Sequence, residues 1–502
     1  MDVSTATQAA AEFALSNAPA IAIGGLAALY AYKAAHAPPA FARKPIGNPA
    51  KSLVEPSSKE LSAMMSELKQ SFERHRTSAR VDKGRWDYAW RIHQLQSLVL
   101  LLEENDAALL QAAKKDIGRT SAEWFLEKGA LQGDLTVIIN GLWGFMGPQA
   151  RGTPLWMQPA SSYVQAEPLG VALVIGAWNV QVALCILPLA AALSAGNAVV
   201  VKPSELAPEQ SKLLAELLPK YLDPEAVRVV EGGPEVSKAL VALPWDFVFY
   251  TGGGKVGALI GASCASRLIP FALELGGKSP TIVDSSANLL VTARRVVQAK
   301  FVNSGQICIA PDYILVVGDK ARERQVVEAF AEQIKWQLGN DPQKSTNYAR
   351  IINDNHFARV QKLLKSGGHV VHGGKSDPTD RYQEPTLVTD VPTDCALMQE
   401  EIFGPVLPIL RVASVDEAIK FINDRPKPLA LYVFADDYKV ANHVVSRTTA
   451  GSMCINEALF QVCPAAVCKL IRRSVHFAAH PVWRRWTLGQ WRVPWRSWLS
   501  GV

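Results

Sequence analysis

The sequence predicts an α/β fold in which a mostly parallel sheet is covered by helices on both faces. First, short runs of Val, Ile, Leu, Ala and Phe alternate with helical stretches between residues 171 and 275. Second, these runs are apolar throughout, which is typical of strands buried on both faces. Third, the 502 residues are 49% hydrophobic and 20% charged, which suits two or three domains and excludes a disordered chain.

The N-terminal residues 1–56 are expected to form an extension outside this sheet. Residues 13–32 contain no charged side chain, and twenty helical residues would span about 30 Å of hydrocarbon. The segment is also rich in Ala and contains Pro19 and Gly24-Gly25, so it is either a membrane anchor or a surface-packed helix. A cleaved signal peptide is not favoured, because no Lys or Arg precedes the segment. Five prolines within residues 36–56 indicate a linker.

The remaining elements follow from periodicity. Residues 60–130 are expected to be helical, because leucines such as Leu95, Leu98 and Leu102 recur at steps of three and four. Ligands of a parallel sheet bind beyond the carboxyl ends of its strands, so the residues after each strand are the first candidates for a site. The expected strands are 171–175, 198–201, 227–230 and 247–250, and the expected helices are 183–195, 208–218, 234–241 and one after Lys255.

Two of the strand ends carry residues that suit a dinucleotide. Lys202 and Glu205 follow the second strand, and such a pair either holds ribose hydroxyls or is a solvated turn pair. Residues 251–257 follow the fourth strand and fit the pattern GxGxxG before a helix. Glycines let a pyrophosphate approach the backbone, and a helix N-terminus favours the anion. A plain glycine-rich turn is the alternative, because the motif does not follow the first strand.

Two further residues stand out from apolar surroundings. Glu274 lies within the strand-like run 271–275, where burial would raise the pKa of its carboxyl and suit it to general-base chemistry. Cys308 lies among small and apolar residues, where a thiol is either an inert core residue or a nucleophile. The seven Cys of the chain include no CxxC pair, so a disulfide framework and a metal site are not expected.

Four short motifs follow one another along the chain: VKPSE at 201–205, ELGGK at 274–278, NSGQIC at 303–308 and EIFGP at 401–405. Together they resemble the motifs of the NAD(P)-dependent aldehyde dehydrogenase superfamily. The residues after Cys308, IAPDY, resemble its class 3, fatty-aldehyde branch. The resemblance covers about residues 61–459 and implies a Rossmann-type cofactor domain at 57–272, an α/β catalytic domain at 273–460 and a bridging β arm at 152–168.

The resemblance implies catalytic roles for three residues. Cys308 would attack an aldehyde as a thiolate, giving a thiohemiacetal and then a thioester. The side chain of Asn179 and the backbone N–H of Cys308 would hold the oxyanion. Glu274 would activate the water that hydrolyses the thioester, which favours hydrolysis over transfer to coenzyme A.

The resemblance also implies a nicotinamide cofactor and an aldehyde substrate. NAD is expected, with NADP as the alternative, because Glu205 facing a 2′-hydroxyl would repel a 2′-phosphate. The substrate class is a medium- or long-chain aldehyde, fatty or isoprenoid, and the chain is expected to form a homodimer. The expected location is the cytoplasm or a cytoplasm-facing membrane, whose surface the N-terminal segment would contact. The residues expected to bind the cofactor are Lys202, Glu205, Thr251, Gly252, Gly257, Glu401 and Phe403.

The sequence departs from the family pattern at three places. Val180 and Gln181 follow Asn179 where the family has Tyr-Pro, which predicts a loop two residues short and a misplaced Asn179. Gly253 replaces a Ser expected near the phosphates. Residues 461–502 contain seven Lys or Arg, five Trp and no Asp or Glu, in place of the family's glycine-rich closing segment. The first 460 residues then carry a net charge of −1, which is not typical of a nucleic-acid-binding protein.

The atypical tail at 461–502 can be read in another frame. Shifting the codons of residues 482–491 by one base allows the sequence FGGVGHSGNG, which resembles the family's closing motif. A frameshift or retained intron beginning between about Gln461 and Val475 is therefore expected; a membrane-surface or RNA-binding segment is the alternative. The altered tail also supports a second hypothesis, a catalytically impaired or dead family member that acts as a membrane-associated binding protein.

Overall fold

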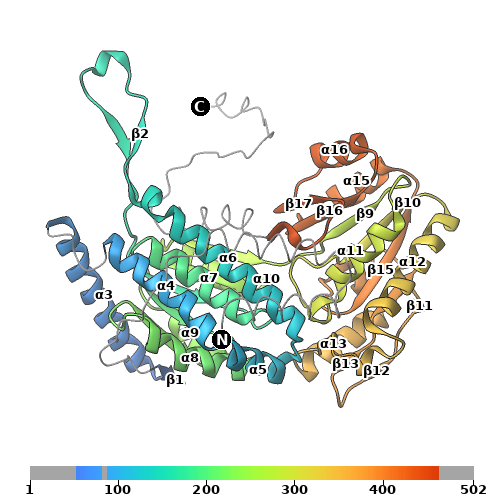
Figure 1. Cartoon of the computed structure of the whole chain (residues 1–502), viewed down its shortest axis with the longest axis horizontal. Coiled ribbons are helices and arrows are strands. Elements are labelled where there is room, and N and C mark those ends of the chain that lie inside the picture. The colour runs from blue at the N-terminus through green and yellow to red at the C-terminus, as the bar shows by residue number, and fades with distance from the viewer. Residues whose placement is uncertain (1–51, 82–86, 463–502) are drawn as a thin grey trace, which may run out of the picture.

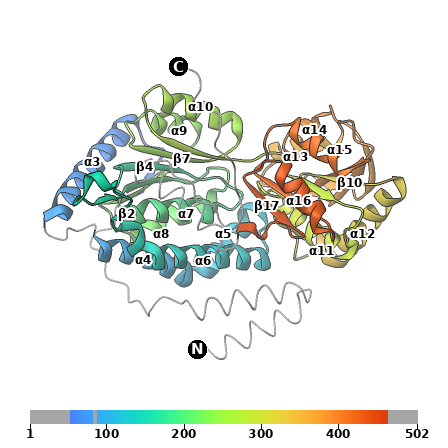
Figure 2. The same ribbon diagram turned by 90° about the horizontal axis from the view of Figure 1, so that it is seen from above.

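The computed structural model describes residues 52–81 and 87–462. Within these residues the chain folds into two α/β units that lie side by side, and a hairpin arm extends from the first unit (Figures 1 and 2). The α/β class predicted from the sequence is therefore confirmed. The candidate membrane anchor at 13–32 and all but the first two residues of the atypical tail lie outside the described residues.

The first unit is built on a six-stranded sheet whose strand pairs are all parallel. The strand order is β1-β6-β5-β4-β7-β8, so the chain runs from β4 to one edge and then crosses to the other. This order is doubly wound, and it places the ends of β4 and β7 at the switch point. The strands are β1 (Leu53–Val54), which falls in the predicted linker, β4 (Val171–Ile175), β5 (Ala198–Lys202), β6 (Val227–Glu231), β7 (Phe247–Gly252) and β8 (Phe271–Leu275).

Helices cover both faces of this sheet, as its apolar strands require. Helices α7 and α8 pack on one face with α4, α5 and α6 outside them, and α3, α9 and α10 lie on the other face (Figure 2). The buried strand residues, such as Leu173, Val200 and Val248, belong to one continuous core. The helices are α3 (Ser58–Val81), α4 (Tyr88–Glu104), α5 (Asp106–Ile117), α6 (Ser121–Met146), α7 (Gln181–Ser194), α8 (Pro208–Tyr221), α9 (Pro234–Val241) and α10 (Gly254–Ala265).

The second unit is built on a seven-stranded sheet in the order β11-β14-β15-β10-β9-β16-β17. All pairs are parallel except β11 with β14. Helices α11 and α12 pack on one face of this sheet and form one hydrophobic core with it. Helices α13, α15 and α16 pack on the other face and form a second core. The strands are β9 (Pro280–Val283), β10 (Tyr313–Val317), β11 (His369–His372), β14 (Thr386–Thr389), β15 (Val406–Val412), β16 (Ala430–Phe434) and β17 (Ser452–Ile455), with a small hairpin of β12 (Ser376–Asp377) and β13 (Tyr382–Gln383). The helices are α11 (Leu289–Phe301), α12 (Lys320–Leu338), α13 (Asp354–Leu364), α14 (Ala396–Gln399), α15 (Val415–Asn423) and α16 (Tyr438–Arg447).

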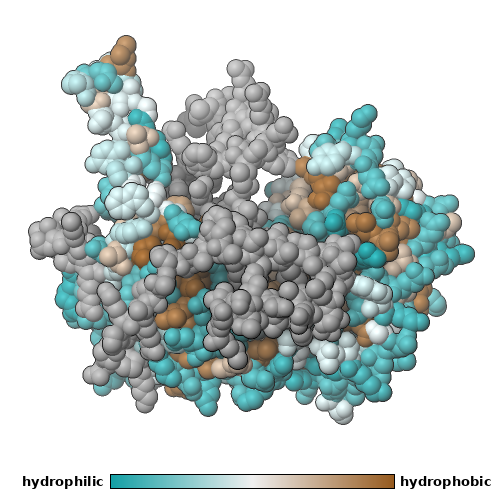
Figure 3. Space-filling model, in the orientation of Figure 1, coloured by the Kyte–Doolittle hydropathy of each residue, from teal (hydrophilic) through white to brown (hydrophobic). Residues whose placement is uncertain are grey.

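The arm is an antiparallel hairpin of β2 (Gln149–Arg151) and β3 (Ser162–Val164). It projects from the first unit in Figure 1, and its tip is hydrophobic in Figure 3. Leu155 and Trp156, in the turn at the tip, are 88% and 83% exposed. Among residues 52–81 and 87–462, no helix is both long enough and apolar enough to cross a bilayer.

Candidate active site

Cys308 follows a tightly wound loop at the end of α11. Asn303, Ser304 and Gly305 have φ values of 53°, 53° and 74°, which is a left-handed conformation that is costly outside glycine. A Cβ at Gly305 would lie 2.3 Å from the carbonyl oxygen of Gly404, so this position requires glycine. The loop is therefore held in a strained shape against the segment that contains Gly404.

The pKa of the Cys308 thiol is raised by burial and by two nearby carboxylates. Burial raises the pKa of this thiol to about 12, and the charges of Glu401 and Glu274 add to the increase. Glu274 lies on β8, where it pairs with Thr251 of β7 in the parallel ladder. The carboxyl edge of the six-stranded sheet is thus brought close to the nucleophile loop of the second unit.

Glu401 lies against the backbone that follows β8. Its carboxylate oxygens would be only 2.2 and 2.4 Å from a Cβ at Gly276. Burial raises the pKa of Glu401 to about 7, and Asp312 adds to the increase, whereas a hydrogen bond from the Gly277 backbone opposes it. Glu401 therefore titrates near neutral pH.

Asp312 connects three of the sequence motifs. It forms an ion pair with Lys278, and its Oδ1 accepts the N–H of Ile402 at 2.9 Å. Lys278 also donates to the carbonyls of Leu397 and Glu400, each at 2.9 Å. The motif at 274–278, the segment after Cys308 and the motif at 401–405 are therefore tied together by one ion pair.

Asn179 contacts the nucleophile loop from the first unit. It lies between β4 and α7, is 4% exposed, and its Nδ2 donates to the carbonyl of Gln306 at 3.0 Å. This contact brings the Asn179 amide to the loop that precedes Cys308, and the misplacement expected from a short loop stays a prediction. Gln181 is buried as well: its Nε2 donates to the carbonyl of Ala207, and its Oε1 accepts the N–H of Ser204. These bonds fix the start of α7 without the Tyr-Pro pair of the family.

Lys202 and Glu205 lie together at the end of β5. Their Nζ and Oε2 atoms are 2.6 Å apart, and the side chains are 2% and 37% exposed. Lys202 also donates to the carbonyl of Pro203 at 3.1 Å. A buried ammonium next to a partly exposed carboxylate leaves Glu205 as the member of the pair that can face a ligand.

The end of β7 and the start of α10 form an open anion cradle. Gly253 is the N-cap of α10 and makes no side-chain capping bond. Apart from its chain neighbours and the backbone of α10 itself, no described atom lies within 4 Å of a Cβ placed at Gly253 or Gly254. Within the described residues, the buried Oγ1 of Thr251 has no hydrogen-bond partner. A Cβ at Gly257 would lie 2.8 Å from Leu275, so glycine lets α10 pack closely on β8. An uncapped helix N-terminus beside an unpaired hydroxyl fits the pyrophosphate of a dinucleotide.

Phe403 lies beside the Asn179 segment. Its ring packs edge-on against Trp178, with ring centroids 5.3 Å apart, and Trp178 also packs against His356 at 5.0 Å. The structure thus brings Cys308, Glu274, Glu401, Asn179 and Phe403 into one region. Lys202, Glu205, Thr251, Gly252 and Gly257 form a second group at the carboxyl edge of the six-stranded sheet.

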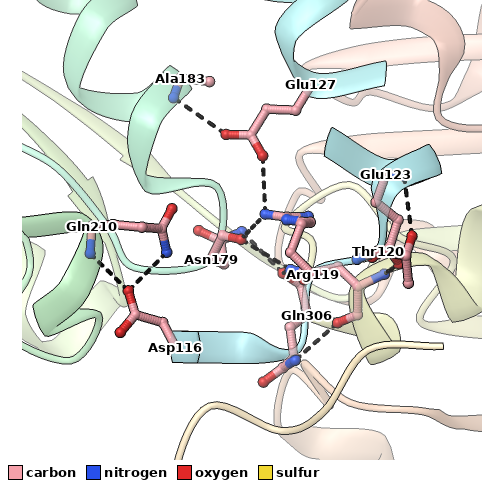
Figure 4. A network of polar contacts seen from close by, with 10 residues as sticks. Asp116, Arg119, Thr120, Glu123, Glu127, Asn179, Ala183, Gln210 and Gln306 are labelled. Carbon is pink, nitrogen blue, oxygen red and sulfur yellow. Dashed lines mark hydrogen bonds and ion pairs between the residues drawn. The ribbon is translucent and has the colours of Figure 1, made fainter. Parts of the chain in front are cut away.

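The sequence motifs do not include the buried polar residues that lie just before α6 and in its first two turns. Arg119, Glu123 and Glu127 surround Asn179 and the nucleophile loop (Figure 4). One signal was available, since Thr120 and Glu123 have the Thr-x-x-Glu spacing of a capping box, which the structure forms. That signal marks a helix start, however, and gives no indication of the distant partners.

Comparisons with known proteins agree with this geometry. The model of the aldehyde dehydrogenase family matches residues 50–466. Aldehyde dehydrogenase family 3 member H1 of Arabidopsis thaliana is 41% identical over 405 residues, 80% of this chain and 82% of that protein. The dimeric NADP-preferring aldehyde dehydrogenase of Rattus norvegicus is 40% identical over 401 residues, 79% and 87% of the two chains.

Two comparisons are with proteins of Staphylococcus aureus. Its 4,4′-diaponeurosporen-aldehyde dehydrogenase is 38% identical over 378 residues, 75% of this chain and 82% of that protein. A solved structure described as the substrate-bound state of Staphylococcus aureus AldH is 36% identical, with a TM-score of 0.76, and covers 80% and 86% of the two chains. The resemblance inferred from the motifs is confirmed: this chain belongs to the aldehyde dehydrogenase family and is an NAD(P)-dependent oxidoreductase.

Proposed function

We propose that this chain oxidises medium- or long-chain aldehydes, fatty or isoprenoid, to carboxylic acids, with NAD as the preferred cofactor. The observation that carries the proposal is the convergence of Cys308, Glu274 and Glu401 next to Asn179. The diaponeurosporen-aldehyde named for one relative supports a lipophilic substrate. The exposed carboxylate of Glu205 supports NAD over NADP, because it would repel a 2′-phosphate.

In this mechanism Cys308 adds to the aldehyde carbon, and the oxygen becomes an oxyanion. The thiol must first lose its proton, since only the thiolate is an effective nucleophile. The oxyanion accepts hydrogen bonds from the Cys308 backbone N–H and from Nδ2 of Asn179. An amide carries two N–H groups; one binds the carbonyl of Gln306, and the other is assigned to the oxyanion. A single donor of this kind contributes on the order of 10²–10³ in rate.

The cofactor-binding residues divide between the two groups already described. Glu205, paired with the buried Lys202, would hold the adenosine ribose. Thr251, Gly252 and Gly257 would lie at the pyrophosphate, where the uncapped start of α10 supports the assignment. NAD, when bound, supplies the acceptor for the hydride that leaves the thiohemiacetal. In the region around Cys308, Glu401 would bind the nicotinamide ribose and Phe403 would flank the ring.

Glu274 completes the reaction by activating the water that hydrolyses the thioester on Cys308. Its half-buried position on β8 supports this role, because a carboxylate shielded from bulk water is a stronger base. The water proton passes to Glu274, the hydroxide adds to the thioester carbon, and the C–S bond breaks to release the acid. The Cys308 thiolate then takes the proton from Glu274, which restores both groups.

The proposal extends to organisation and assembly. Residues 57–272 act as the cofactor domain and residues 273–460 as the catalytic domain. The arm at 152–168 bridges a homodimer, which the exposed apolar tip and the dimeric rat relative support. The N-terminal extension, residues 1–56, is the part of the chain proposed to contact a cytoplasm-facing membrane.

The test is NADH formation by the purified full-length chain with hexadecanal, benzaldehyde and succinic semialdehyde. We expect the highest kcat/KM with hexadecanal, and no activity in Cys308→Ala. The Glu274→Gln variant should accumulate an acyl group on Cys308 that mass spectrometry detects. Activity in Cys308→Ala would overturn the mechanism. A folded chain that forms no NADH with any aldehyde would instead support the impaired binding protein, which the end of the family match at residue 466 favours.

A further inference from the structure

Buried polar residues from the corner between α5 and α6 hold the Asn179 segment (Figure 4). We infer that Arg119, oriented by Glu127, is a positioning residue that fixes the backbone of Asn179 and so aims its side chain at the oxyanion. The inference rests on the proposed role of Asn179 and adds two residues that the motifs do not contain.

Arg119 is bonded directly to the Asn179 backbone. Its Nη2 donates to the Asn179 carbonyl at 2.6 Å and lies 3.1 Å from Oε2 of Glu127. The two side chains of this ion pair are 3% and 6% exposed. Burying a guanidinium and a carboxylate is costly unless the two charges are paired. Within the described residues, Nε of Arg119 and Oε2 of Glu127 have no hydrogen-bond partner, so the ion pair is the contact that joins the two side chains. The pair therefore holds Arg119 in one orientation, with its donor on the carbonyl 60 residues away.

Glu127 also compensates for a weak start of α7. The N-cap residue of α7 is Val180, which has no side-chain oxygen and makes no capping bond. Oε1 of Glu127 accepts the N–H of Ala183 at 3.4 Å instead, from the first turn of the helix. A negative charge at a helix N-terminus is favourable. Burial raises the pKa of Glu127, and the charge of Arg119 and the N–H of Ala183 oppose that increase. The carboxylate thus holds the residues that follow Asn179, while Arg119 holds Asn179 itself.

The same corner also holds the nucleophile loop. Oε1 of Glu123 accepts the N–H of Asn303 at 2.6 Å, and Oε2 accepts the N–H of Thr120 at 2.9 Å. Nδ2 of Asn303 donates to the carbonyls of Asn179 and Gln306, at 3.0 and 3.1 Å. The segment that aims the oxyanion donor and the loop that carries the thiol are therefore held from one helix start.

This arrangement predicts a specific kinetic loss. The carbonyl of Asn179 accepts from Arg119 and Asn303 together, so removing Arg119 leaves one of two restraints. A shift of about 1 Å in an oxyanion donor lowers the rate by roughly 10²-fold. The loss should appear in kcat, because Arg119 does not touch the substrate.

The experiment is a double-mutant cycle on the full-length chain. Arg119→Ala and Asn179→Ala are made singly and together, with Arg119→Lys as the conservative variant and Glu127→Gln as a milder change. Arg91→Ala is the control, because Arg91 is a partly buried arginine that donates to the carbonyl of Ser194, at the C-terminal end of α7. The readouts are kcat, KM for aldehyde, thermal unfolding and the rate of Cys308 alkylation by iodoacetamide.

We expect Arg119→Ala to lower kcat about 10- to 100-fold with KM changed less than about threefold, and Arg119→Lys to restore part of the loss. The double variant should be no slower than Asn179→Ala alone, because both changes remove one interaction. If the loss of kcat in the double variant equals the product of the two single losses, Arg119 does not act through Asn179 and the inference is overturned. An equal loss of kcat in Arg91→Ala at matched stability would likewise show that Arg119 has only a structural role. If Arg119→Ala does not fold, Glu127→Gln with Asn179→Ala gives the same cycle. An inactive wild type would refute the proposed function, whereas an active wild type with multiplicative losses would refute only the inference about Arg119.

Discussion

Replacing Gly276 by Ala should displace the Glu401 carboxylate without unfolding the chain. The new Cβ would lie 2.2 Å from Oε1 and 2.4 Å from Oε2 of Glu401, so one of the two groups must move. Gly276 is not among the described residues with positive φ, and its backbone therefore accepts alanine. Because the opposing atoms end a flexible side chain, Glu401 can rotate away while the backbone stays in place.

The expected size of the effect follows from what Glu401 is proposed to bind. A hydrogen bond to a charged acceptor contributes about 1.5–3 kcal/mol. Losing it from the nicotinamide ribose should raise KM for NAD about 10- to 100-fold. The fold should lose on the order of 1 kcal/mol, which corresponds to a fall in Tm of about 1 °C when a chain of 502 residues unfolds as a whole.

The assay compares KM for NAD, kcat and Tm in wild type, Gly276→Ala and a matched control. The control is Gly144→Ala on α6, where no described atom lies within 4 Å of the new Cβ. An unchanged KM for NAD in Gly276→Ala would refute the assignment of Glu401. A large fall in Tm would show that the backbone, and not the carboxylate, absorbs the clash.

Three further outcomes are expected. Gly305→Ala should prevent folding, because its Cβ would meet the backbone carbonyl of Gly404 at 2.3 Å and its φ is 74°; a cooperative thermal transition near that of wild type would contradict this. Glu205→Gln should raise kcat/KM for NADP relative to NAD about tenfold, since a carboxylate no longer opposes the 2′-phosphate; an unchanged ratio of the two values would argue against its place at the ribose. Sequencing the transcript should reveal a frameshift or retained intron after about Gln461, and a correctly spliced message with one intact frame through Trp495 would exclude it.

The elements of the first sheet could be predicted because each strand is a continuous apolar run bounded by turn residues. The bounds of β4 (Val171–Ile175) and α9 (Pro234–Val241) match the prediction. Other bounds depend on tertiary contacts that composition does not record. Strand β7 extends to Gly252 because it pairs with β8. Helix α7 begins at Gln181, two residues early, because the Gln181 side chain bonds to Ser204 and Ala207 and Glu127 accepts the N–H of Ala183.

The site could be predicted only as far as its motifs reach. Cys308, Glu274 and Glu401 lie in short motifs whose chemistry is visible in the sequence. Arg119 and Glu127 carry no such signal, because their meaning depends on a carbonyl at Asn179 that the fold brings to them. The two donors that hold the carbonyl of Asn179 could not be foreseen either, since Arg119 and Asn303 are distant from it in the sequence.

The charges around Cys308 lead to a last prediction about pH. Burial with Glu401 and Glu274 raises the pKa of the thiol to about 12, and Glu401 itself titrates at about 7. As pH rises from 6 to 8, Glu401 ionises and opposes ionisation of the thiol, so the two titrations are coupled. Alkylation of wild-type Cys308 by iodoacetamide should then accelerate by less than tenfold per pH unit in this range. In Glu401→Gln the thiol has a lower pKa, and alkylation should be faster at pH 8 and rise tenfold per unit. Superimposable pH profiles for the two proteins would mean that Glu401 does not act on the sulfur, and the proposed arrangement of the site would have to be abandoned.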